Sequence, residues 1–227
     1  MLTIKNLSVS YGNQDVIKNL DLEIKPGECH GIAGLNGAGK TTLFNAIYGS
    51  VNKTSGEILL FNENIGKSNI TFLETQQFFY SRITGNEYLK IFQIRNKKFD
   101  IPAWNKIFNL PVNKLIENYS TGMKKKLGLM GILSMDNPVF LFDEPFNGLD
   151  LETNRIVKRI LENLAHRQKI ILISSHIMES LTGLCDKISY LNNGKIEFTT
   201  DKTGFKEIEN RIFKGLNEEQ LDLPFSK

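Results

Sequence analysis

One glycine-rich stretch, Gly34–Thr42 with the sequence GLNGAGKTT, restricts what this chain can fold into more than any other feature. It matches the phosphate-binding loop pattern G-x-x-x-x-G-K-[ST] without a mismatch. That pattern needs a buried strand before the loop and a helix after it. Here residues 29–33 read as a short buried strand, and 40–48 have helical apolar spacing. An ordinary glycine-rich turn would not need both flanks, so the stretch predicts an α/β core that binds a nucleoside triphosphate.

The residue types of this loop indicate how it would hold phosphates. Glycines allow successive backbone N–H groups to turn inward around an oxyanion. The helix that follows presents its own free N–H groups and the positive end of its dipole to the same anion. Lys40 can reach the outer phosphates, and the Thr41 hydroxyl can ligate Mg²⁺. The residues expected at the phosphates are Asn36, Gly37, Ala38, Gly39, Lys40, Thr41 and Thr42.

A pair of carboxylates follows a second buried strand. Residues 139–142 are a continuous apolar run, which is typical of a strand buried on both faces of a parallel sheet. Open α/β sheets place their chemistry at the carboxyl ends of such strands. Asp143 would therefore hold Mg²⁺ with Thr41, and Glu144 would be the general base for an attacking water, rather than a mere surface acid. His176 closes the next buried strand, so we expect it near Asp143 and facing the γ-phosphate.

The remaining pattern predicts three structural parts. The fold class is α/β: a P-loop NTPase core with a mainly parallel sheet, an N-terminal antiparallel β subdomain and a small helical subdomain at about 78–135. The whole chain, 1–227, is expected to be one domain with a short charged tail at about 201–227. Expected helices are 86–95, one starting at Ile101-Pro102, 124–133 with Ser120 as N-cap, 151–166 with Ile156, Ile160 and Leu164 on one face, and one near 205–213.

Length and composition narrow the class of protein. A chain of 227 residues is long enough for one sizeable α/β domain. Its net charge of +3 gives no argument for nucleic acid. Cys29 and Cys185 form no CxxC pair, which favours two core thiols in a reducing cytoplasm over a disulfide or zinc site. The first ten residues lack a signal-peptide pattern and no stretch is long enough to span a bilayer, so a membrane role would require a partner.

Two further features are ambiguous from position alone. Tyr11 precedes a turn, where an aromatic ring can stack on adenine but is more often part of strand packing. The run Lys124–Lys126 lies on the predicted helix 124–133, and a solvated helix face is the ordinary interpretation of such a charge run.

Several segments, taken together, resemble a known family. In order and approximate spacing they are similar to the nucleotide-binding domain of ATP-binding cassette (ABC) transporters, over roughly residues 1–200. These segments are Tyr11, the loop 34–42, 119–123, Asp143-Glu144-Pro145, 147–150 and His176.

The resemblance implies roles that the residues alone do not. ATP would be the nucleotide, with Mg²⁺, and Tyr11 would stack on its adenine. Ser120 and Gly122 would contact the γ-phosphate held by an opposite subunit. Asp150 would lie in a loop that crosses the dimer interface, and His176 would contact the γ-phosphate.

The sequence departs from the family pattern at two places. The signature is Tyr-Ser-Thr-Gly-Met at 119–123 instead of the usual Leu-Ser-Gly-Gly-Gln, and is similar to that of exporters whose cassette and membrane subunit are separate chains. Thr75 occupies the usual glutamine position, so Gln76, one step later, is our prediction for the residue that meets Mg²⁺ and the attacking water. The segment 78–84 would receive the membrane subunit, although its aromatic residues are equally compatible with the core of the helical insert.

These observations predict the cytoplasmic ATPase subunit of an ABC transporter, more in line with an exporter than an importer. Its partners would be an integral membrane permease and a second cassette, either identical or different, with no nucleic acid. One alternative is a soluble ABC ATPase of a cofactor-assembly machine. A GTPase is a weaker alternative, because the guanine-recognition pattern N/T-K-x-D is missing where it would be expected and the segment 119–123 would have no explanation.

Overall fold

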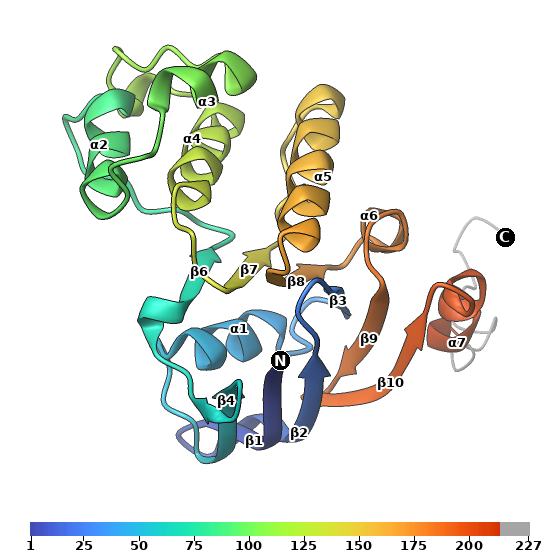
Figure 1. Ribbon diagram of the computed structural model, residues 1–227. Helices are drawn as coiled ribbons and strands as arrows, with labels where there is room; N and C mark the ends of the chain where they lie inside the picture. The colour runs from blue at the N-terminus through green and yellow to red at the C-terminus, as the bar shows by residue number, and fades with distance from the viewer. Residues whose placement is uncertain (214–227) are drawn as a thin grey trace, which may run out of the picture.

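A six-stranded sheet forms the centre of the protein, as the computed structural model shows for residues 1–213 (Figure 1). All neighbouring strands are parallel except the hairpin of β9 and β10. In spatial order the strands are β10 (Lys195–Asp201), β9 (Lys187–Asn192), β3 (Cys29–Ala33), β8 (Ile170–Ser175), β7 (Val139–Asp143) and β6 (Ile70–Leu73). Because β3, β7 and β8 are parallel, the segments that follow them meet at one edge of the sheet.

The strands of this sheet are buried on both faces, as their apolar runs predict. On β7, Phe140 and Phe142 belong to one hydrophobic cluster, whereas Val139 and Leu141 belong to the cluster on the opposite face. Alternating side chains of a strand point to opposite faces, so a continuous apolar run supplies both cores.

A second sheet is formed by the N-terminal strands and is antiparallel throughout, which confirms the predicted subdomain. Its strands, in spatial order, are β2 (Gln14–Ile24), β1 (Leu2–Tyr11), β4 (Ser55–Leu60) and β5 (Glu63–Asn64). Helix α1 (Lys40–Tyr48) lies between the two sheets (Figure 1) and contributes Leu43 and Phe44 to their shared core. The short strand β5 has no counterpart among the predicted elements.

Three helices lie together beside β6, between it and β7 in sequence (Figure 1). They are α2 (Gly85–Arg95), α3 (Ile101–Phe108) and α4 (Thr121–Leu133). Each begins at a polar side chain that accepts a hydrogen bond from the first turn: Thr84, Asp100 and Ser120. Helices α2 and α3 pack on α4, and α4 packs against β6, so α4 connects the three helices to the central sheet.

Helix α5 (Leu151–His166) has the predicted bounds, and Ile156, Ile160 and Leu164 all pack against one hydrophobic cluster, as expected of one face. Val157, Leu161 and Leu164 are buried, whereas Ile156 and Ile160 are only partly buried. Positions 157, 161 and 164 follow the i, i+4, i+7 stripe of a helix and form the centre of the buried face, and Ile156 and Ile160 lie at its margin.

The last described elements include α6 (Met178–Thr182), which was not predicted, and α7 (Ile208–Phe213) after a 3₁₀ turn at Phe205–Glu207. Two more 3₁₀ turns are Lys67–Asn69 and Ile116–Asn118. Most of the predicted tail lies outside the described residues. Within residues 1–213, no helix combines the length and apolar character needed to cross a bilayer. Cys29 and Cys185 are buried free thiols whose sulfur atoms are 3.9 Å apart.

Candidate functional site

The loop between β3 and α1 adopts the backbone conformation that its glycines predict. Gly37 and Gly39 have φ values of +82° and +108°, a region that favours glycine. At Gly34 an added Cβ would lie 2.5 Å from the carbonyl oxygen of Leu191, so the loop passes too close to β9 for a side chain. Gly39 caps α1 without any side-chain hydrogen bond, which leaves the first N–H groups of the helix available to an anion.

A hollow of about 550 Å³ opens beside this loop at the carboxyl edge of the sheet. It brings together residues from five separate segments of the chain. Those lining it are Val16, Asn36, Gly37, Gly39, Lys40, Thr41, Thr42, Thr75, Asp143, Glu144, Asn147 and His176. Of the expected phosphate-loop residues, only Ala38 is outside this set; it is buried, and its N–H donates to the Leu35 carbonyl at 3.1 Å.

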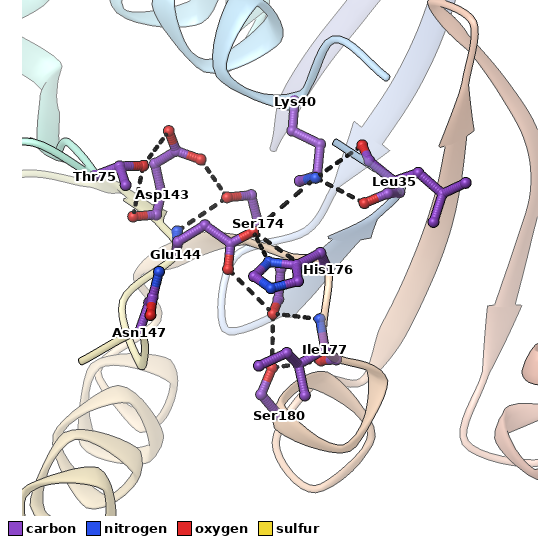
Figure 2. Close-up of polar contacts among 12 residues, drawn as sticks. Leu35, Lys40, Thr75, Asp143, Glu144, Asn147, Ser174, His176, Ile177 and Ser180 are labelled. Atoms are coloured by element: carbon purple, nitrogen blue, oxygen red, sulfur yellow. Dashed lines mark hydrogen bonds and ion pairs between the residues drawn. The ribbon is translucent and has the colours of Figure 1, made fainter. Parts of the chain in front are cut away.

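The Lys40 side chain is buried and folds over its own loop. Its Nζ donates to the carbonyl oxygens of Gly34, at 2.7 Å, and Leu35, at 3.2 Å, and lies 4.0 Å from Glu144 Oε1 (Figure 2). Burial lowers the pKa of this ammonium, while the carboxylates of Glu144 and Asp143 oppose that effect. The Lys40 Nζ is therefore held inside the loop by two carbonyl oxygens, with the Glu144 carboxylate nearby.

The carboxylate of Asp143 accepts hydrogen bonds from hydroxyl groups of three separate segments. Its Oδ2 accepts hydrogen bonds from Thr41 Oγ1 and Thr75 Oγ1, both at 2.8 Å, and its Oδ1 accepts one from Ser174 Oγ. Thr41 and Asp143, predicted as Mg²⁺ ligands, are thus in contact. Mg²⁺ prefers oxygen donors, and two hydroxyl groups that converge on one carboxylate oxygen are a donor set of this kind.

Gln76 does not take part in this cluster. It is exposed and lines a neighbouring hollow, whereas Thr75, the residue before it, reaches Asp143 (Figure 2). Both residues lie in a bend beyond the end of β6, and the course of the backbone through this bend turns the Thr75 hydroxyl toward Asp143.

Glu144 is largely enclosed, and its carboxylate is held by the segment after β8. Its Oε1 accepts from the backbone N–H of His176 at 3.0 Å and lies 2.8 Å from His176 Nδ1, while Oε2 accepts from Ser175 Oγ at 3.4 Å (Figure 2). The backbone of Glu144 has φ +50°, the left-handed region, which is unfavourable for a residue with a side chain. Strain of this kind persists where the surroundings hold it, and it is common at functional sites.

The run of three lysines in α4 is not a uniformly solvated face, which corrects our interpretation of that run. Lys125 is buried, and its Nζ donates to the carbonyl oxygens of Glu144 at 2.5 Å and Asn147 at 2.9 Å. Lys126 lies 3.3 Å from Asp150, and only Lys124 has no such contact among residues 1–213. The helix lies close enough to the segment after β7 for the second lysine to bridge the two.

Besides Ala38 and Gln76, four predicted site residues lie outside the hollow. Tyr11 is 49% exposed at the end of β1. Ser120 and Gly122 are at the start of α4, where the Ser120 hydroxyl accepts from the N–H of Met123 at 3.2 Å. Asp150 caps α5, and the hydrogen bond from the Thr153 N–H, together with those from its hydroxyl and from Lys126, lowers the pKa of Asp150 to about 2.

Sequence reasoning missed some residues that support the site. Ser174 holds both the Asp143 carboxylate and the Glu144 N–H, and the signal was present, because two serines end the strand next to that of Asp143. Asn147 lines the hollow and supplies a carbonyl oxygen to Lys125. No local pattern distinguishes Asn147 from an ordinary loop asparagine.

Comparison with known proteins agrees with this geometry. Residues 17–147 match the family described as "ABC transporter". The chain is 31% identical over 216 residues to the ABC transporter ATP-binding protein YtrB of Bacillus subtilis, covering 91% of this chain and 74% of the relative. It is 34% identical over 204 residues to the bacitracin transport ATP-binding protein BcrA of Bacillus licheniformis, covering 84% of this chain and 66% of the relative.

Solved structures share the fold. A structure described as the ATP-binding subunit of an ABC transporter superposes with a TM-score of 0.84 at 23% identity, covering 97% of both chains. A dimeric post-hydrolysis state of an ATP-binding cassette bound to ADP and Pi gives a TM-score of 0.80 at 23% identity, over 89% of this chain and 99% of the other. With the matched family and the loop–carboxylate site, these likenesses lead to one conclusion: the chain belongs to the ABC transporter family, as an ATP-binding ATPase subunit.

Proposed function

We propose that this chain hydrolyses Mg-ATP with Glu144 as general base, in a pair of cassettes, and so powers export by a separately encoded membrane permease. The observation that carries the hydrolytic part is the placement of Glu144 in the hollow of the phosphate loop, 4.0 Å from Lys40 Nζ and in contact with His176. A carboxylate there can accept the proton of a water that attacks a phosphate bound to the loop.

For the metal, we propose Asp143, Thr41 and Thr75 as the groups that hold Mg²⁺, directly or through water. When bound, the ion would neutralise charge on the outer phosphates. Support for Thr75 is its hydroxyl, which shares Asp143 Oδ2 with Thr41 at equal distances of 2.8 Å. Gln76, the residue of our sequence prediction, lines the neighbouring hollow and is the weaker candidate.

The other residues of the hollow would bind and orient ATP. The loop 36–42 would hold the phosphates through its N–H groups and Lys40. His176 would contact the γ-phosphate through the ring nitrogen that does not face Glu144. It would so hold the Glu144 carboxylate and the γ-phosphate in fixed positions relative to each other. Tyr11 would stack on the adenine, and its 49% exposure leaves a ring face available for that.

The second cassette is inferred from the residues outside the hollow. Ser120, Gly122 and Asp150 match family positions that act across a dimer, and none of them lines this chain's own hollow. Ser120 and Asp150 are both exposed. In a head-to-tail pair, the start of α4 would complete the site of the partner, in the way that a helix N-terminus binds an anion.

The permease and the direction of transport are inferred from relatives and from one exposed segment. Relatives are named for bacitracin transport and, in Streptococcus pyogenes, for lantibiotic transport. Phe78 and Tyr80 are 76% and 60% exposed, next to Phe79, which packs inward against Tyr88. Exposed aromatic side chains of this kind are typical of interaction surfaces, so this segment would receive the permease on the cytoplasmic side of the membrane.

The test of the hydrolytic pair is the solution mass of the Glu144→Gln variant, measured by light scattering with and without Mg-ATP. Loss of the base should trap the ATP-bound dimer, so we expect a shift from monomer to dimer that requires Mg-ATP, together with loss of phosphate release. A monomer that binds ATP and never dimerises would contradict the homodimer and point to a different second cassette.

The partner class is tested by co-purification of the tagged chain from its own cells in mild detergent. An integral membrane protein is the expected partner, and a soluble assembly scaffold would contradict the transport role. The double variant Phe78→Ser/Tyr80→Ser should lose the membrane protein. Phe61→Ser is the matched control, because Phe61 is 58% exposed in the turn between β4 and β5 of the N-terminal sheet, outside the segment 78–84.

A further inference from the structure

Lys125 connects the helical subdomain to the catalytic segment through a single side chain. It lies in the second turn of α4, is 7% exposed, and its Nζ donates to the carbonyl oxygens of Glu144 at 2.5 Å and of Asn147 at 2.9 Å. A buried ammonium is stable only when its donors are satisfied, and here the acceptors come from the segment that carries the general base. Burial lowers the pKa of Lys125, an effect that Glu144 and Asp143 oppose.

The backbone of Glu144 needs support from outside its own segment. Its φ of +50° is unfavourable for a residue with a Cβ. On the amide side, its N–H donates to the Ser174 carbonyl at 3.3 Å and to Ser174 Oγ at 3.1 Å. On the carbonyl side, its oxygen accepts from the Asn147 N–H at 3.3 Å and from Lys125. The short, charged hydrogen bond from Lys125 therefore holds the carbonyl group of Glu144, whose backbone conformation is strained.

The same helix also carries the segment proposed to face the second cassette. Helix α4 begins at Ser120, five residues before Lys125 in the sequence. Next to Lys125, Lys126 lies 3.3 Å from Asp150, which begins α5. At Gly122, an added Cβ would lie 3.4 Å from the carbonyl oxygen of Gly148. Helix α4 thus contacts the segment 144–150 at successive points along its first two turns.

We propose that Lys125 is a positioning residue for hydrolysis: it fixes the backbone of Glu144 from α4, so that the general base is in place only when the helical subdomain is docked on the core. This inference rests on the proposed function, since it assumes that Glu144 is the base. Among residues 1–213, the hydrogen bonds of the Lys125 side chain go to Glu144 and Asn147 and none goes to the phosphate loop, so its effect is on the rate of the chemical step.

The test compares Lys125→Met with Lys124→Met in the full chain. Methionine keeps the length and packing of the lysine stem and removes the donor. Lys124 lies on the same turn of α4 and has no side-chain hydrogen bond or ion pair with the segment 144–150. Misplacement of a catalytic group by about 1 Å costs on the order of 100-fold in rate, so we expect Lys125→Met to lower kcat by about 10- to 100-fold.

A merely structural role would give a different pattern. We expect KM, the affinity for a fluorescent ATP analogue and the melting temperature of Lys125→Met to stay close to those of the native chain. Lys125→Gln, which can still donate to one carbonyl oxygen, should lie between the two. A native kcat in Lys125→Met would overturn the proposal. So would a fall in kcat that is matched by lost nucleotide affinity or by a lower melting temperature.

A second measurement separates this proposal from the function on which it rests. The double variant Lys125→Met/Glu144→Gln should dimerise with Mg-ATP as Glu144→Gln does, because Lys125 acts only on the base that is already removed. Loss of dimerisation in the double variant alone would overturn the positioning role and assign Lys125 to the partner-facing end of α4. Failure of Glu144→Gln itself to lose hydrolysis would instead overturn the proposed function.

Discussion

Two regions of the molecule differ in how many partners one chain supplies to their polar groups. One is the hollow at the edge of the central sheet, and the other is the start of α4. In the hollow, Lys40, Thr41, Asp143 and Glu144 each have a hydrogen-bonding or ionic partner from another segment of the chain. At the start of α4, the exposed Ser120 hydroxyl accepts only the capping bond of its own helix in the described chain. Burial against several segments preorganises a site. The exposed start of a helix takes part in a site only when another molecule binds to it.

The largest expected effect is in the hollow. Glu144→Gln should lower kcat by about 10²- to 10⁴-fold, because the amide cannot accept the proton of the attacking water. Nucleotide binding should be retained, since the amide keeps the size of the side chain. Phosphate release and binding of a fluorescent nucleotide measure the two quantities. The control is Glu152→Gln, an exposed acid in the first turn of α5, and a native rate in Glu144→Gln would remove Glu144 from the role of base.

The second effect tests whether one chain binds ATP alone. Lys40→Ala removes charge-assisted hydrogen bonds worth about 1.5–3 kcal/mol, which corresponds to roughly a 10- to 100-fold loss of affinity. Titration of the monomer with a fluorescent nucleotide measures this. Lys97→Ala, a change at an exposed lysine beyond the end of α2, should bind as the native chain does. Equal affinities of the two variants would contradict the phosphate-binding role of Lys40.

The third effect sharpens the contrast between the two regions. Ser120→Asp keeps an N-cap acceptor but places a negative charge at the start of α4, so we expect kcat to fall by about tenfold or more while the monomer binds ATP normally. Ser120→Ala is the companion variant, because it loses the cap without adding charge. If Ser120→Asp hydrolyses ATP as the native chain does, the start of α4 does not face a phosphate.

A smaller effect distinguishes Thr75 from Gln76. Thr75→Val removes one hydroxyl from Asp143 while keeping the shape of the side chain, so the Mg²⁺ concentration for half-maximal hydrolysis should rise by several-fold, roughly 1 kcal/mol in binding. Gln76→Ala should change it little. The measurement is a Mg²⁺ titration at saturating ATP, and the reverse ranking of the two variants would restore Gln76 as the ligand.

The smallest effect concerns the cap of α5. The pKa of Asp150 is lowered to about 2, so its ionised form is stabilised by folding. This contribution is fully present above the unfolded pKa, near 3.8, and is lost as the pH falls toward 2. The melting temperature of Asp150→Ala should therefore be below that of the native chain at pH 7, and the difference should shrink below pH 4. A difference that is constant with pH would assign the loss to something other than the carboxylate.

One interpretation from the sequence was wrong, and one prediction stays untested. The lysine run was expected to be solvated, whereas Lys125 is buried. Gln76 was chosen over Thr75 for the metal, and the Thr75 hydroxyl is the one that contacts Asp143. Both depend on where a side chain points once α4 and the end of β6 are packed. Lys125 meets Glu144 across 19 residues, and Thr75 meets Asp143 across 68. The local sequence of a charge run, or of two neighbouring polar residues, does not indicate which of the side chains points into the protein.

The sequence by itself determined the phosphate loop, the buried strands that precede Asp143 and His176, the N-cap at Ser120 and the α/β class. Each of these follows from conformational or solvation demands of adjacent residues: glycines where φ is positive, apolar runs where both faces are buried, a polar side chain where N–H groups lack partners. The tertiary structure alone decided the contacts of Thr75, Ser174 and Lys125. These contacts form only when elements far apart in the chain pack together. A polar group needs one specific partner only once it is buried, because water can no longer serve as its partner.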